Sequence, residues 1–129
     1  MDSLRGVNCL LMTPFDEDGD IDVRSLCRLA DHVIEAGAAS LVAMGKIGEF
    51  SVLTMEERRR TMSVVVDHVG GRVPVGFGII NAGYEEGLTL GENARESGAD
   101  YVMSRPPVDG DTMDYFLRLT DLLPVMVYD

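Results

Sequence analysis

The residue types best suited to chemistry gather around Lys46, the one lysine in a chain that also holds ten arginines. It lies in the stretch Gly-Lys-Ile-Gly-Glu-Phe, residues 45–50, directly after a short apolar run. Two glycines around two residues allow a sharp turn with outward-facing backbone N–H groups, an arrangement that can hold a carboxylate. Glu49 could pair with Lys46 or accept hydrogen bonds from the loop. Lys46 could instead bind an anionic substrate or act as a covalent nucleophile, so three interpretations stay open.

An acidic stretch at residues 16–22, Asp-Glu-Asp-Gly-Asp-Ile-Asp, is similar to the start of a calcium-binding loop. Its glycine stands at the fourth position rather than the sixth, and Cys27 occupies the twelfth position, where such a loop needs glutamate. We therefore predict a tight turn at Gly19 followed by a helix N-cap at Asp20 or Asp22, and no metal site.

A second stretch, Gly-Phe-Gly-Ile-Ile-Asn at residues 76–81, holds the first two glycines of a dinucleotide-binding fingerprint. Asn81 stands in place of the third glycine, so we expect no nucleotide site and no cofactor. His32 and His68 fall outside the apolar stripes of their helices and are predicted to lie on the surface. The Glu-Glu-Arg-Arg-Arg stretch at residues 56–60 is predicted to form a solvated helix face.

The charge balance limits the classes of partner. Twenty-two acidic residues face eleven basic ones, giving a formal net charge of -11 and a pI near 4.4. A surface of this kind repels nucleic acid and anionic membranes, so neither is an expected partner. The first 15 residues hold only a short apolar stretch, and Cys9 and Cys27 lack metal-ligand or redox spacing. We expect buried free thiols and a cytoplasmic protein.

Along the chain, continuous apolar runs alternate with segments of helical spacing. Such runs are typical of strands buried on both faces. The predicted strands are residues 7–12, 41–44, 73–79, 101–104 and 124–128. The predicted helical stripes are Leu26, Leu29, Ala30 and Val33; Met62, Val65, Val66 and Val69; and Met113, Phe116, Leu117 and Thr120. Residues 84–97 form a further predicted helix, whose glycines indicate close packing against a sheet.

This alternation of five strands and four helices predicts an α/β fold with a right-handed parallel sheet. No linker or low-complexity tract interrupts it, so residues 1–129 are expected to form one unit without an internal boundary. In such folds the chemistry gathers where the strands end. The five stretches at those ends are residues 13–15, 45–50, 78–83, 104–110 and 128–129.

The order of several motifs resembles the dihydrodipicolinate synthase and N-acetylneuraminate lyase family along the whole chain. The motifs are TPFDEDGDID, GKIGEF, LTMEERRR, GRVPVGFG, SGADYV and LLPVMVYD. The resemblance implies the N-terminal portion of a (β/α)8 TIM barrel. It also implies a small-molecule substrate, pyruvate or another 2-oxo acid, bound as a Schiff base during aldol addition, aldol cleavage or dehydration. Oligomers are a further implication of the family.

Carried over residue by residue, Tyr128 matches the family's strand-five tyrosine, which relays protons and positions the carbonyl. Lys46 and Ile47 stand in the loop that commonly reads Gly-Thr-Thr-Gly-Glu, so Gly45, Lys46, Ile47 and Gly48 are the implied substrate-binding residues. Both hydroxyls of that loop are missing here, and residues 105–110 lack the tyrosines found after strand four in the synthases. A divergent lyase therefore fits better than a lysine-biosynthesis synthase.

The family's Schiff-base lysine belongs to the sixth strand, and the 129 residues end after the fifth. The leading interpretation is therefore a lyase or aldolase fragment that needs a C-terminal half, with Lys46 offering its charge to an anionic substrate. A barrel needs about 250 residues, and half of one has two unpaired sheet edges. The alternative is a catalytically inactive half-barrel that serves as an interaction or regulatory module.

Overall fold

The computed structural model describes residues 4–128, in which five strands and four α-helices alternate. They are β1 (Asn8–Leu10), α1 (Val23–Glu35), β2 (Ser40–Ala43), α2 (Met55–Val69), β3 (Val75–Ile79), α3 (Tyr84–Glu96), β4 (Tyr101–Ser104), α4 (Thr112–Leu122) and β5 (Val125–Val127). The predicted order of elements is confirmed. β4 has the predicted bounds, whereas β1, β3 and β5 are shorter than their apolar runs.

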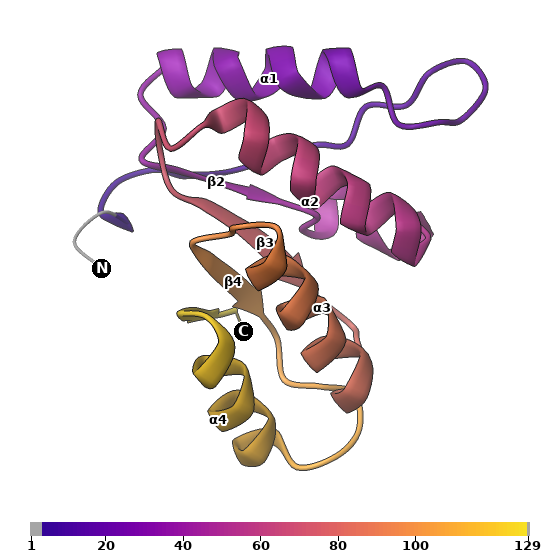
Figure 1. Ribbon diagram of the computed structural model, residues 1–129, viewed down its shortest axis with the longest axis vertical. Coiled ribbons are helices and arrows are strands. Elements are labelled where there is room, and N and C mark those ends of the chain that lie inside the picture. The colour runs from indigo at the N-terminus through magenta and orange to yellow at the C-terminus, as the bar shows by residue number, and fades with distance from the viewer. Residues whose placement is uncertain (1–3, 129) are drawn as a thin grey trace.

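The five strands form one parallel sheet in the order β1-β2-β3-β4-β5. Figure 1 shows the four helices following one another in an arc along the outer side of the strands. Because every strand runs in the same direction, all five carboxyl ends lie at one edge of the sheet. The sheet is open, with β1 and β5 as its edge strands. It has the strand order of one part of a closed parallel barrel.

The chain enters α1 through a turn built by aspartates. Asp16 Oδ1 accepts hydrogen bonds from the N–H groups of Asp18 and Asp20, and Gly19 adopts a positive φ of 85°. Asp22 then caps α1 by accepting from the N–H of Ser25. The side chain of Ser25, and after it this backbone N–H, lower the pKa of the Asp22 carboxyl. The predicted turn and N-cap are confirmed, with Asp22 rather than Asp20 as the cap.

Helix α2 has a defined cap at each end. Thr54 and Glu57 form a reciprocal capping box, which lowers the pKa of Glu57, and Gly70 ends the helix with a φ of 58°. Of the predicted stripe, Met62, Val65 and Val69 are buried and Val66 is partly buried. The prediction of a solvated face at residues 56–60 is wrong for Arg58, which is 8% exposed.

Helices α3 and α4 pack on each other through glycines. A Cβ at Gly87 would lie 2.5 Å from Tyr115 Oη, and one at Gly91 would lie 2.5 Å from Leu119 Cδ1. The glycines of α3 therefore serve helix-to-helix contact, and the predicted contact with the sheet is wrong for them. The predicted stripe of α4 is also wrong. Tyr115 and Leu119 are buried, whereas Met113 and Leu117 are 70% and 60% exposed and Thr120 is exposed.

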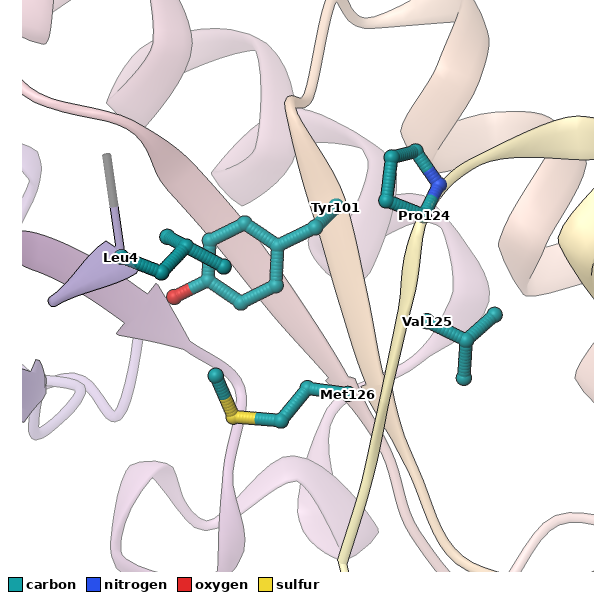
Figure 2. A pocket seen from close by; sticks show the side chains of 5 residues that line it. All are labelled: Leu4, Tyr101, Pro124, Val125 and Met126. Carbon is teal, nitrogen blue, oxygen red and sulfur yellow. The ribbon is translucent and has the colours of Figure 1, made fainter. Parts of the chain in front are cut away.

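The face of the sheet opposite the helices contains an apolar cavity of about 340 Å³. Figure 2 shows the ring of Tyr101 at its centre, between Leu4 on one side and β5 on the other. Its lining residues are Leu4, Tyr101, Pro124, Val125 and Met126. All of these residues except Met126, the second residue of β5, precede or begin their strands. The cavity therefore lies toward the amino ends of the strands, away from the edge where the candidate site lies.

Other predictions concern individual side chains. His32 and His68 are exposed as predicted, and His68 Nε2 lies 2.9 Å from Asp31 Oδ1. Cys9 and Cys27 are free but only partly buried, so the prediction of buried thiols is wrong; partial burial raises the pKa of Cys27. Within residues 4–128, no cluster of His, Cys, Asp and Glu could hold a metal ion. No helix in this range has the length and apolarity needed to cross a membrane.

Candidate functional site

The loops that follow the strands lie at one edge of the sheet, as the parallel topology requires. Cross-strand hydrogen bonds continue into several of them. Leu11 N donates to Val42 O at 2.8 Å, Arg105 N to Ile79 O at 3.2 Å, and Tyr128 N to Ser104 O at 2.9 Å. The sheet therefore fixes the backbone from which the loops after β1, β4 and β5 depart.

The loop after β2 has an unusual backbone. Lys46–Gly48 form one 3-10 turn, η2, in which Gly48 N donates to Gly45 O at 2.9 Å and Glu49 N to Lys46 O at 3.2 Å. Met44 and Glu49, which flank the loop, have positive φ values of 57° and 53°. Non-glycine residues rarely adopt this left-handed conformation, so surrounding contacts must hold it in place.

Three contacts hold this loop against its neighbours. Thr13, in the loop after β1, donates from Oγ1 to Gly48 O at 2.7 Å. A Cβ at Gly48 would lie 3.1 Å from Leu11 O, so a side chain there would press on the end of β1. A Cβ at Gly78 of β3 would lie 2.5 Å from Met44 O. Gly48 in the turn and Gly78 beneath it allow the backbones to approach closely. Gly78 therefore has a packing role, and a nucleotide-binding role is not needed to explain it.

The four predicted substrate-binding residues fall on this turn. Lys46 and Ile47 are exposed, Ile47 by 53%, whereas Gly45 and Gly48 are buried. Among residues 4–128, Lys46 and Glu49 form no ion pair, and no hydrogen bond joins the Glu49 carboxylate to the loop. The structure therefore offers no support for the interpretation of Lys46 as half of a structural ion pair.

A buried arginine supports the far end of the loop. Phe50–Val52 form a second 3-10 turn, η3, and Phe50 is buried beneath the Arg58 guanidinium, whose Cζ lies 4.5 Å from the ring centroid. Arg58 also pairs with Glu86 of α3 at 3.0 Å. The arginine connects the loop after β2 to α2 and α3, a role that the run of charges in the sequence did not reveal.

Tyr128 lies directly after β5, at the end of the predicted strand 124–128 but outside the observed one, with 43% of its surface exposed. The guanidinium of Arg105, from the loop after β4, lies over its ring with Cζ 6.0 Å from the centroid, at the outer limit of a cation–π contact. Sequence reasoning did not single out Arg105. Its position directly after a predicted strand was the available signal, but its proximity to Tyr128 depends on the β4–β5 pairing.

Chemically, the edge combines three features suited to an anionic carbonyl compound. They are the turn after β2 that carries Lys46, the phenol of Tyr128 after β5, and the guanidinium of Arg105 after β4. The hydrogen bonds inside η2 use the N–H groups of Gly48 and Glu49 and leave those of Lys46 and Ile47 without an acceptor in the turn. Such N–H groups and two cations favour a carboxylate in a chain that is otherwise strongly acidic.

Comparisons with known proteins identify relatives of the chain. The chain is 41% identical over 99 residues to the 4-hydroxy-tetrahydrodipicolinate synthase of Salinibacter ruber, covering 77% of this chain and 33% of that protein. It is 35% identical over 124 residues to the putative 2-dehydro-3-deoxy-D-gluconate aldolase YagE of Escherichia coli, covering 91% of this chain and 41% of YagE. The chain thus spans less than half the length of these curated relatives.

Solved structures agree with the sequence comparison. The crystal structure of E. coli YagE in complex with pyruvate superposes with a TM-score of 0.88 at 34% identity, covering 96% of this chain and 44% of that one. Dihydrodipicolinate synthase from Bacillus clausii gives 0.86 at 29%, covering 98% and 45%. The predicted resemblance to the N-terminal part of such barrels is confirmed. Residues 3–128 match the dihydrodipicolinate synthetase family, and the chain belongs to that family.

Proposed function

We propose that this chain forms the substrate-carboxylate and tyrosine side of a Schiff-base lyase or aldolase that acts on pyruvate or another 2-oxo acid. The observation that carries the proposal is the placement of the Gly45–Gly48 turn and Tyr128 at one edge of a parallel sheet. Family membership and the pyruvate complex of YagE support the substrate class.

In this proposal the turn after β2 binds the carboxylate of the 2-oxo acid. The N–H groups of Lys46 and Ile47 donate to the carboxylate oxygens, and the Lys46 ammonium supplies the charge that hydroxyl groups do not supply here. An exposed lysine that forms no ion pair within the described residues suits this task, because a bound anion replaces only water around it.

Tyr128 is proposed to orient the keto group and carry a proton while the imine forms. When an amine attacks the carbonyl carbon, the oxygen must gain protons before it leaves as water, and a phenol can donate and regain one. Arg105 adds a positive charge beside the Tyr128 ring. The structure gives Tyr128 a backbone fixed by Ser104 and a side chain partly open to solvent.

The imine-forming amine is proposed to come from outside these 129 residues, since their one lysine lies after β2 and not on a sixth strand. The proposed source is the remaining part of a barrel, here called the completing half. It would pair with both edge strands and cover the α4 face made of Met113 and Leu117. A second copy fits less well, because its five strands would exceed the three that an eight-stranded barrel lacks.

Complementation tests this proposal. The 129-residue chain would be mixed with a completing half taken from the part of YagE beyond the matched 44%. We expect a 1:1 complex in size-exclusion chromatography with light scattering, and pyruvate binding by that complex. Met113→Asp with Leu117→Asp should prevent assembly, because both side chains are exposed in the isolated chain and would be buried in the complex.

Val52→Asp is the matched control, since Val52 is 64% exposed but lies in η3, away from α4. The control should assemble normally. Assembly that tolerates both aspartates on α4 would contradict the proposed interface. A 1:1 complex that binds no 2-oxo acid would contradict the enzymatic proposal and favour an interaction module instead.

A further inference from the structure

Thr13 is a buried residue whose side chain makes a specific contact with the turn after β2. It is 9% exposed, and its hydroxyl donates to Gly48 O at 2.7 Å across 35 positions of sequence. A buried hydroxyl needs a partner. The acceptor here is the carbonyl of the last residue of η2, so the bond fixes the end of the turn that carries Lys46.

The same turn is under backbone strain at both ends. Met44 and Glu49 hold the left-handed conformation, at φ 57° and 53°, and neither is glycine. Residues in this region stay there only when surrounding contacts impose it. Glu49 directly follows the carbonyl that Thr13 holds, and the Glu49 side chain forms no bond within residues 4–128 that would fix it. The Thr13 hydrogen bond is therefore the side-chain contact positioned to impose the turn geometry.

We propose that Thr13 is a positioning residue for the 2-oxo acid carboxylate: it holds Gly48 so that the Lys46–Gly48 turn keeps the one conformation that binds the anion. This inference rests on the proposed function. Thr13 itself does not touch the substrate. Its effect passes through Gly48 to the N–H groups of Lys46 and Ile47 and to the Lys46 ammonium.

Amide exchange of the 129-residue chain, read residue by residue by NMR, tests the positioning directly. Thr13→Val keeps the shape and removes the hydroxyl, and Thr13→Ala removes it without adding a methyl group. Both should speed exchange of the Gly48 and Glu49 amides by about tenfold, the scale of one lost hydrogen bond, and leave the β3 amides unchanged. Thr13→Ser keeps the donor and should restore slow exchange.

A pyruvate titration of the 1:1 complex with the completing half, followed on the same amides, links the turn to the ligand. Wild type and Thr13→Ser should show saturable shifts of Gly48 and Glu49, and the two variants without a hydroxyl should need about tenfold more pyruvate. Unchanged exchange in Thr13→Val and Thr13→Ala would overturn the role of Thr13, whatever pyruvate does. Faster exchange in both, with no pyruvate shift in any protein including wild type, would instead overturn the proposed carboxylate site.

Discussion

The ring of Tyr101 occupies the space that a side chain at position 76 would need. A Cβ on Gly76 would lie 2.5 Å from Tyr101 Cε2 and Cζ. The ring therefore passes over β3, and its hydroxyl lies 2.8 Å from Ser40 Oγ on β2. Burial raises the pKa of Tyr101, so the phenol stays neutral and can hydrogen-bond. Glycine is thus required at position 76 of β3, because the Tyr101 side chain crosses it to connect β4 with β2.

Gly76→Ala should destabilise the chain by about 1 to 3 kcal/mol, the cost of forcing an extra carbon into a packed core. In a Tyr101→Leu background the same change should cost less, because the ring that it strikes is gone. Urea denaturation of the four proteins gives the coupling. Equal costs in the two backgrounds would contradict the close approach of residues 76 and 101.

Asp31 on α1 should make folding stability depend on pH. Hydrogen bonds from Arg72 at 2.7 Å and from His68 at 2.9 Å lower the pKa of its carboxyl. A lowered pKa contributes stability above the unfolded-state value of about 3.9, and this contribution is lost as the pH falls through the folded-state value. The advantage of wild type over Asp31→Asn should therefore shrink as the pH is lowered below about 4.

Urea midpoints measured across this pH range check the Asp31 prediction. Asp67→Asn is the matched control, because Asp67 is an exposed carboxylate on α2 with no ion pair among the described residues. The control should differ from wild type by less than about 0.5 kcal/mol at each pH. An advantage of Asp31 over asparagine that grows toward acid would show that the sign is wrong.

Added salt should stabilise this protein. With 22 acidic and 11 basic residues, the compact chain repels itself, and screening weakens that repulsion. Between about 0.1 M and 1 M potassium chloride the screening length falls from roughly 10 Å to 3 Å. Thermal melts over this range should shift upward. Melting temperatures that stay constant or fall would show that self-repulsion does not limit the fold.

The regular parts of this fold could be predicted from sequence because each element carries its own signal. Thr54 and Glu57 form a capping box at the start of α2, and the apolar run at residues 101–104 has the bounds of β4. Helix α4 shows where this fails. It carries apolar side chains on two sides, and the packed side was decided by Gly87 and Gly91 of another helix.

The candidate site could be located but not built from sequence. The type and spacing of residues 45–50 indicate an anion-binding turn, and Tyr128 follows from the family resemblance. The left-handed Glu49 could not be foreseen, because the contact beside it comes from Thr13, far away in the chain. The same reason applies to Arg105 and Tyr128, which meet only because β4 and β5 pair.

Lys46→Met in the 1:1 complex with the completing half should weaken 2-oxo acid binding by about 1 to 3 kcal/mol, the scale of a charge-assisted hydrogen bond. The fold should remain intact, since the Lys46 side chain is exposed and forms no ion pair within the described chain. Calorimetry measures the affinity, and Lys46→Arg, which keeps the charge, should retain more of it than methionine. Unchanged affinity in Lys46→Met would remove the lysine from the site.

We propose that these residues bind the 2-oxo acid while another segment supplies the imine-forming amine. An imine lysine is usually activated by desolvation or by a neighbouring cation, and Lys46 is exposed, so it lacks the first. Pyruvate and borohydride would be added to the isolated chain and to its complex with the completing half. Each sample would then be digested, and the peptide masses would be measured by mass spectrometry. We predict a reduced pyruvate adduct on a lysine of the completing half and none on Lys46; stoichiometric labelling of Lys46 in the isolated chain would contradict the claim.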